Sequence, residues 1–172
     1  MNMGQYYKVV NITKKEVIKP RVFGDGAKLL EFGSSSGGTM TALAILLADG
    51  NGRGGGDLHM PENHSFTGLV GSWAGNQIVV TGDYADQGRF GASPDKNLYQ
   101  DAEKYKDISL HVMELMCCDK YLCKQLLEAT RWHEDVELCP ALYKERKKGI
   151  PRPTGETASS VRNRLNPSLT PA

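Results

Sequence analysis

Glycine is concentrated in one stretch of the chain: sixteen of the nineteen glycines lie between Gly24 and Gly91. Glycine loses more backbone entropy on folding than any other residue. Such a concentration therefore needs a reason, namely positive φ angles, tight turns or the close approach of a ligand. The densest part is GNGRGGGD at residues 50–57, and no Gly-Lys-Ser/Thr follows it as in a phosphate-binding P-loop. This stretch also holds nearly every polar candidate residue, so it predicts either turns or a binding site.

Two β-hairpins are predicted on either side of an apolar helix. Residues 6–10 and 16–19 are rich in β-forming side chains and flank a turn, and residues 69–73 and 77–81 repeat this pattern. Between the hairpins, TMTALAILLADG at residues 39–50 is apolar on nearly every face of a helix, which predicts a buried central helix.

The second half of the chain predicts a helical pair. Apolar residues recur at spacings of three and four over residues 98–115, which is typical of an amphipathic helix. Asn97 and Gln100 occupy the positions of a capping box at its start. One unbroken helix would be long for a chain of this size, so we expect a break near Asp119, which can cap the second helix.

These elements predict an α+β fold. We expect an antiparallel sheet of about four strands, packed with the central helix and the helical pair, in one globular domain over residues 1–139. Residues 140–172 are rich in proline and basic side chains and are expected to form an extended or disordered tail.

Charge and apolar content limit the partners. Residues 141–172 carry seven basic and two acidic side chains, a net charge of +5, although the whole chain carries only +1. The body of the domain therefore shows no sign of binding nucleic acid, whereas the tail favours weak contacts with an anionic partner. No apolar run approaches the roughly 18 residues that span a bilayer, and the start lacks the features of a signal peptide. We expect a cytoplasmic protein with no membrane contact.

Four cysteines lie close together in the helical region, namely Cys117, Cys118, Cys123 and Cys139. Their spacing matches neither paired zinc knuckles nor a secreted disulfide framework. We expect reduced thiols that fill a helix interface, and neither a metal nor a cofactor is predicted.

The segment GSSSGGT at residues 33–39 is the strongest candidate for anion binding. It precedes a helix whose free N–H groups and dipole favour a negative group, and Ser34, Ser35, Ser36 and Thr39 can donate hydrogen bonds. The same residues equally suit an ordinary helix cap. Arg53 and Arg89, both in glycine-rich loops, are the candidate cations.

A hydrolase site is the alternative. Asp57, His59 and Asp83 are residue types that hold a divalent metal or transfer protons, and His64 and Asp86 lie near them in the sequence. No H-E-x-x-H motif supports this assignment.

Five sequence blocks carry a resemblance to a known family. MGQYYKVVN at residues 3–11, together with KLLEFG, LLADGNGRGGGD, VGSWAG and GDYAD, resembles a family of uncharacterised proteins from bacteria, phages and fungi. The resemblance covers about residues 3–110 and implies no activity, cofactor or catalytic residue, because none is established for that family. The blocks coincide with the glycine-rich stretch. They favour a common site built from residues 33–39, Asn51, Arg53, Asp57, Trp73 and Asp83.

The favoured hypothesis is therefore a non-catalytic domain that binds, or in a phage setting sequesters, a small anionic, nucleotide-like ligand, with Trp73 stacking on a ring. Two alternatives stay open. One is the metal-dependent hydrolase that uses Asp57, His59 and Asp83. The other is a protein-interaction or homo-oligomer module that associates through a sheet edge or a helix.

Overall fold

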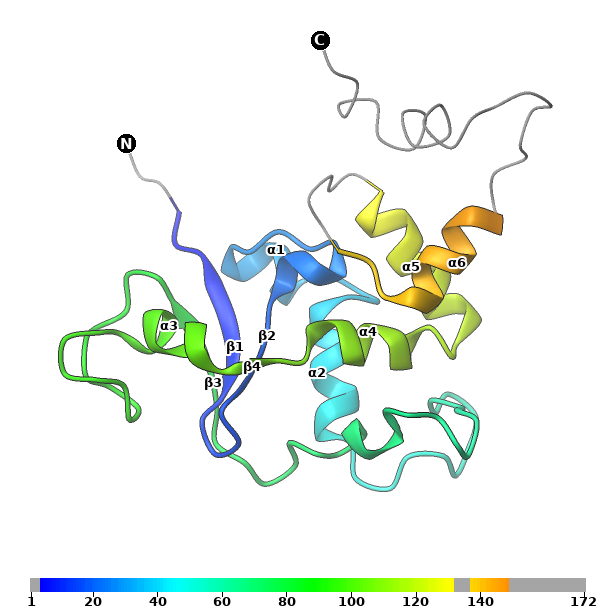
Figure 1. Cartoon of the computed structure of the whole chain (residues 1–172), viewed down its shortest axis with the longest axis horizontal. Coiled ribbons are helices and arrows are strands. Elements are labelled where there is room, and N and C mark those ends of the chain that lie inside the picture. Colours follow the sequence, from blue (N-terminus) through cyan, green and yellow to red (C-terminus); the bar gives the residue numbers. More distant parts are fainter. Residues whose placement is uncertain (1–3, 132–136, 149–172) are drawn as a thin grey trace, which may run out of the picture.

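The computed structural model describes residues 4–131 and 137–148 and has an α+β fold (Figure 1). The first hairpin is confirmed: β1 (Tyr7–Asn11) and β2 (Glu16–Ile18) pair antiparallel. β3 (Ile78–Gly82) pairs antiparallel with the other side of β1, and β4 (Lys106–Asp107) pairs parallel with β2. The strand order is β3-β1-β2-β4. The sheet is therefore mixed, and the expectation of a purely antiparallel sheet is corrected.

Helices cover both faces of this sheet. The α-helices are α1 (Leu29–Gly33), α2 (Thr39–Leu47), α3 (Leu98–Asp101), α4 (Ser109–Met116), α5 (Lys120–Thr130) and α6 (Pro140–Lys148). Three short 3₁₀ helices are η1 (Pro20–Phe23), η2 (Thr67–Leu69) and η3 (Ala102–Lys104). Among the residues that the structure describes, no helix has both the length and the apolar character needed to cross a membrane.

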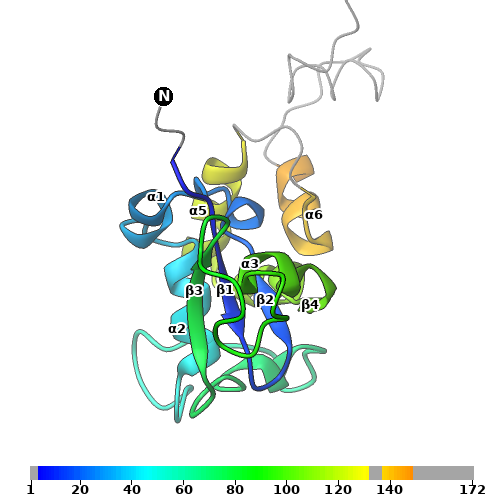
Figure 2. The same cartoon turned by 90° about the vertical axis from the view of Figure 1, so that its left-hand side faces the viewer.

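The central strand β1 contributes to two separate cores, because successive side chains of a strand point to opposite faces. Val9 lies in the larger core, with α2, α4, α5 and α6, whereas Val10 lies in a smaller core with α3 and η3. Figure 2 shows this arrangement face-on, with α3 in front of the sheet and α2 behind it.

The predicted helix boundaries near residues 97 and 119 are confirmed. The Asn97 side chain accepts a hydrogen bond from the backbone N–H of Gln100, and the Gln100 side chain accepts one from the backbone N–H of Asn97. The Asp119 side chain accepts a hydrogen bond from the N–H of Leu122 at the start of α5.

The single amphipathic helix predicted over residues 98–115 is wrong. The chain forms α3 and η3, runs as β4 beside β2, and then forms α4. Leu98, Ala102 and Tyr105 lie in the smaller core, whereas Ile108 and Val112 lie in the larger one. The apparent helical stripe is therefore two short apolar patterns that pack on opposite faces of the sheet.

The second predicted hairpin is also wrong, because residues 69–73 form no strand. Gly71 has φ +69°, and an added Cβ would lie 2.4 Å from the carbonyl oxygen of Ala48. The N–H groups of Gly71 and Trp73 donate to the carbonyls of Ile45 and Leu46, at 2.9 and 2.8 Å. This segment thus satisfies the free carbonyls at the end of α2, which no strand in that position would reach.

Two further expectations need correction. Residues 140–148 were expected to be extended, yet they form α6, which packs against α4 and α5 and buries Leu142 completely. Proline is favoured in the first turn of a helix, so Pro140 does not oppose it. The rest of the predicted tail, residues 149–172, lies outside the described residues.

The central helix α2 was expected to be buried, but it is buried on one side only, because Met40, Ala44 and Leu47 are exposed.

Candidate functional site

The glycine-rich loop after α2 is closed by its own side chains. Asp57 Oδ2 accepts hydrogen bonds from the backbone N–H groups of Gly52, Arg53 and Gly54, at 2.8, 2.7 and 3.2 Å. Successive N–H groups that point to one spot form a concave anion site, and here the Asp57 carboxylate fills it. The N–H groups of Arg53 and Gly52 hold the pKa of Asp57 below its usual value.

A second pair of contacts fixes the neck of this loop. The Asn51 side chain accepts from the N–H of Leu58 and donates to its carbonyl, both at 2.9 Å. Gly50, Gly52 and Gly56 have φ angles of +80°, +92° and +91°, which glycine adopts without strain. The glycines therefore shape the path of the loop. The Arg53 side chain is exposed on it.

The start of α2, the other anion candidate, is likewise filled from within the chain. Asp25 Oδ2 accepts hydrogen bonds from the backbone N–H of Thr39, at 2.7 Å, and from the Thr39 hydroxyl. A Cβ on Gly38 would lie 2.5 Å from the same carboxylate oxygen, so the contact requires glycine there. Asp25 thus caps α2 and supplies the negative charge that its N-terminus favours.

Two of the three serines before α2 bind the end of the preceding helix α1. The hydroxyl of Ser34 donates to the carbonyl of Leu30, and that of Ser35 donates to the carbonyl of Phe32 at 3.0 Å. Ser36 is exposed beside them. The alternative from the sequence was a cap on the helix that follows, whereas Ser34 and Ser35 bind carbonyls of the helix that precedes them.

Trp73 is inaccessible to a ligand. Its side chain is 0% exposed, in the larger core, and its indole N–H donates to Glu16 Oε2 at 2.7 Å. The expectation that this ring stacks on a ligand is therefore wrong for this structure, because no part of its face reaches solvent.

The expected common site does not form, since its parts lie far apart. Residues 33–39 precede α2 and residues 50–57 follow it, so the nine residues of α2, about 13 Å of helix, separate them. Asp83 follows β3, where its Oδ1 accepts from the N–H of Tyr6 at 3.0 Å. The proposed metal ligands Asp57 and Asp83 are engaged in different loops. Over residues 4–131 and 137–148, no three His, Cys, Asp or Glu side chains are grouped so that they could hold a metal.

Three of the four cysteines meet at the junction of α4, α5 and the segment before α6. Cys123 and Cys139 are buried, and all four are free thiols. A hydrogen bond with Cys139, together with burial, raises the pKa of the Cys117 thiol. Burial raises the pKa of Cys123 as well. These free thiols fill a helix interface, as expected.

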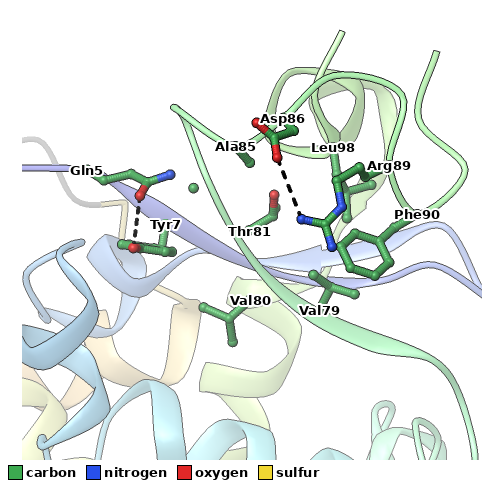
Figure 3. Close-up of a pocket in the computed structure, with 11 residues that line it drawn as sticks. Gln5, Tyr7, Val79, Val80, Thr81, Ala85, Asp86, Arg89, Phe90 and Leu98 are labelled. Carbon is green, nitrogen blue, oxygen red and sulfur yellow. Dashed lines mark hydrogen bonds and ion pairs between the residues drawn. The ribbon is translucent and has the colours of Figure 1, made fainter. Parts of the chain in front are cut away.

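A pocket of about 190 Å³ lies beside β3 (Figure 3). It is lined by Gln5, Tyr7, Val79, Val80, Thr81, Gly82, Ala85, Asp86, Arg89, Phe90 and Leu98. The Arg89 guanidinium lies 4.8 Å from the centre of the Phe90 ring and 3.8 Å from Asp86 Oδ2. At 3.8 Å the ion pair is longer than a hydrogen bond, and both side chains are exposed.

The loop after β3 holds Arg89 over the pocket. Gly88 and Phe90 have positive φ angles, +67° and +54°, and this conformation is uncommon for a phenylalanine. Asn97 anchors the loop, because its side-chain amide donates to the carbonyls of Asp83 and Ala85 at 2.9 and 3.2 Å. Of the residues singled out in the sequence, Arg89 and Asp86 are thus brought together at a pocket.

Sequence reasoning missed Asp25 and most of this pocket. Asp25 caps a helix that begins 14 residues later, outside the range of any capping motif. Gln5, Thr81 and Phe90 come from the first residues, from β3 and from the loop after it, so no local spacing connects them.

No family model matches the chain, and comparison with curated proteins and with solved structures gives no match.

Proposed function

We propose that this chain binds a small anionic molecule without catalysing a reaction, and that the ligand enters the pocket beside β3. The observation that carries the proposal is the position of Arg89, whose guanidinium lines a pocket of about 190 Å³. A guanidinium pairs with a carboxylate or phosphate through two parallel hydrogen bonds. Asp86 leaves this capacity largely unused, because its oxygen lies 3.8 Å away.

The other lining residues support a ligand with an apolar part. Val79, Leu98 and the Phe90 ring supply an apolar wall, and the Thr81 side chain lies on the same side of β3 as Arg89 (Figure 3). Pockets for drug-sized ligands usually hold about 300–1,000 Å³, so this one suits a smaller group. One phosphate or carboxylate with a short apolar part fits best, and a nucleotide would insert only one end.

The loops that the sequence favoured are weaker candidates. Asp57 already accepts the converging N–H groups of the glycine loop, and Asp25 accepts the N–H and hydroxyl of Thr39 at the start of α2. An external anion at either place would have to displace a tethered carboxylate. The proposal therefore moves the ligand from residues 33–39 and 50–57 to Arg89.

Two matched variants test this location. The protein is titrated with inorganic phosphate, a nucleoside monophosphate and small carboxylates, while backbone amide chemical shifts are recorded. We expect at least one of these anions to shift the amides of Thr81, Ala85 and Phe90. Arg89→Gln should abolish the shifts, whereas Arg53→Gln should leave them unchanged.

Other results would contradict the proposal. Shifts confined to Gly52, Arg53 and Gly54, or lost in Arg53→Gln, would return the site to the glycine loop. Native mass spectrometry of the purified protein tests retention of a ligand independently. An empty protein that responds to none of the anions would exclude the binding function.

A further inference from the structure

The outer face of α2 is apolar but uncovered. Met40 and Leu47 are each 39% exposed, Ala44 is exposed and Leu43 is half-buried. These four residues follow the helical spacing i, i+3, i+4, i+7, and none of the nine residues of α2 is charged. A helix that is apolar all round is normally buried all round, so this face lacks the cover that its sequence requires.

The free edge of β3 has the same character. β3 pairs with β1 only, in a register that places Val79 opposite Val10 and Thr81 opposite Lys8. Just beyond the two ends of β3, the N–H of Ile12 donates to the carbonyl of Gln77, and the N–H of Asp83 donates to the carbonyl of Tyr6. Hydrogen-bonding alternates along an antiparallel ladder, so the N–H and C=O groups of Ile78 and Val80 point away from β1.

Nothing in the sequence of β3 protects this edge. Its residues, IVVTG, include neither a charge nor a proline, the usual devices that keep edge strands from pairing. Val80 is 41% exposed, and its side chain points to the opposite side of the sheet from Thr81, which is the side that α2 covers (Figure 3). Figure 2 shows α2 directly behind β3, at the same end of the sheet. We call the free edge of β3 and the outer face of α2 together the β3–α2 surface.

We propose that the β3–α2 surface binds a second copy of this chain, forming a two-fold symmetric dimer with one continuous eight-stranded sheet. Val80 is the exposed residue at the middle of this edge and Ile78 on one side of it is half-buried. Gly82 on the other side is buried with the Gln5 side chain packed against it, so pairing at Gly82 also requires Gln5 to move aside. Antiparallel pairing of β3 with its own copy therefore places Val80 opposite the partner's Val80, and Ile78 opposite the partner's Gly82.

A second copy explains both halves of the surface. A two-fold axis perpendicular to the sheet keeps the two α2 helices on the same side, where their apolar faces meet across the axis. An extended peptide would pair with the edge but leave Met40, Ala44 and Leu47 exposed. The residues of α2 and β3 themselves carry no charge, so their contact with a second copy involves no like-charge repulsion between these two elements. Val80 and Gly82 also line the pocket of the proposed function, so a second copy and the anionic ligand would compete for this edge.

The position of Val80 on the two-fold axis allows a charge-swap experiment. The mass of the full chain in solution is measured by sedimentation equilibrium over a range of concentrations. We expect the wild type to have twice the 18.9 kDa mass of one chain. Val80→Lys and Val80→Glu should each be monomeric, because like charges would face each other. An equal mixture of the two variants should dimerise again.

Two further variants distinguish loss of the β3–α2 contact from non-specific effects of a substitution on dimerisation. Ala44→Glu, on α2, should also give a monomer, and it keeps the test open if the Val80 variants do not fold. Tyr121→Lys lies on α5, where the side chain is 67% exposed, and should remain dimeric.

Three results would overturn the proposal. One is a wild-type protein that stays monomeric at every concentration. A monomer that instead binds an extended peptide along β3 would count as this same result. Another is a dimer that persists in the Val80 and Ala44 variants. The last is a mixture of the Lys and Glu variants that stays monomeric, which would exclude the two-fold register.

Discussion

Two aspartates place their carboxylates where an external anion was expected. Asp57 accepts three backbone N–H groups of the glycine loop, and Asp25 accepts from the first turn of α2. Backbone N–H groups that converge attract a negative charge of any origin, and a side chain tethered nearby supplies it at high effective concentration. A glycine- and serine-rich segment therefore does not by itself indicate a ligand.

The Asp57 contacts predict how the glycine loop responds to acid. The folded-state pKa of Asp57 lies below its ordinary value of 3.8, because the N–H groups of Arg53 and Gly52 favour the ionised form. A depressed pKa stabilises the closed loop above pH 3.8, and this stabilisation is lost as the pH falls through the folded-state value.

An NMR titration checks this prediction. The amide shifts of Gly52 and Gly54 should change together, with a midpoint below 3.8. Asp57→Asn should remove the transition. A midpoint above 3.8, or the same transition in the Asn variant, would contradict the closed loop.

At the scale of one element, α2 depends on a cap from outside its own sequence. Asp25→Ala leaves the N–H of Thr39 without its acceptor, and we expect the free energy of unfolding to fall by about 1–2 kcal/mol. Asp25→Asn keeps one acceptor oxygen and should cost less. Urea unfolding of the three proteins measures the difference, and equal stability of Asp25→Ala and wild type would exclude the capping role.

The helix α6 offers a matched pair of adjacent residues. Leu142 is completely buried, whereas Tyr143 is 52% exposed. Leu142→Ala should destabilise the protein by about 2–5 kcal/mol, because it removes a buried side chain and leaves a cavity. Tyr143→Ala should stay within about 0.5 kcal/mol of wild type, as exposed substitutions usually do. Thermal unfolding distinguishes them, and equal effects would mean that α6 does not pack as described.

At the scale of the whole molecule, β1 joins the two cores. Val9 and Val10 are adjacent but face opposite sides of the sheet, each completely buried. Val9→Ala and Val10→Ala should each cost about 2 kcal/mol from lost burial and the cavity left behind. Both cores should still unfold in one transition, seen alike by far-UV circular dichroism and intrinsic fluorescence. Two separate transitions would show that the cores are independent.

Local signals predicted several elements correctly. The hairpin of β1 and β2, the capping box at Asn97 and the cap at Asp119 each depend on residues within a few positions of one another. The class of fold followed from these elements. Arg53 and Arg89 were chosen as candidate cations by the same kind of local signal, an arginine in a glycine-rich loop, and the ligand role of Arg89 stays a prediction.

The predictions that failed concern segments whose structure depends on partners far away in the sequence. Residues 69–73 have the composition of a strand, but the carbonyls at the end of α2 take their N–H groups. Residues 98–115 have the spacing of one helix, but β2 pairs with Lys106 and Asp107 in the middle. The pocket residues come from three segments that only folding brings together.

The sequence by itself determined the short-range features of this protein: its caps, its first hairpin, the glycine turns and the apolar character of α2. The tertiary structure decided which strand pairs with which, where the two cores divide, and that Asp25 caps a helix that begins 14 residues later. The physical reason is range. Propensities and caps act over one turn of the chain, whereas hydrogen-bond partners and buried faces are chosen among all segments at once.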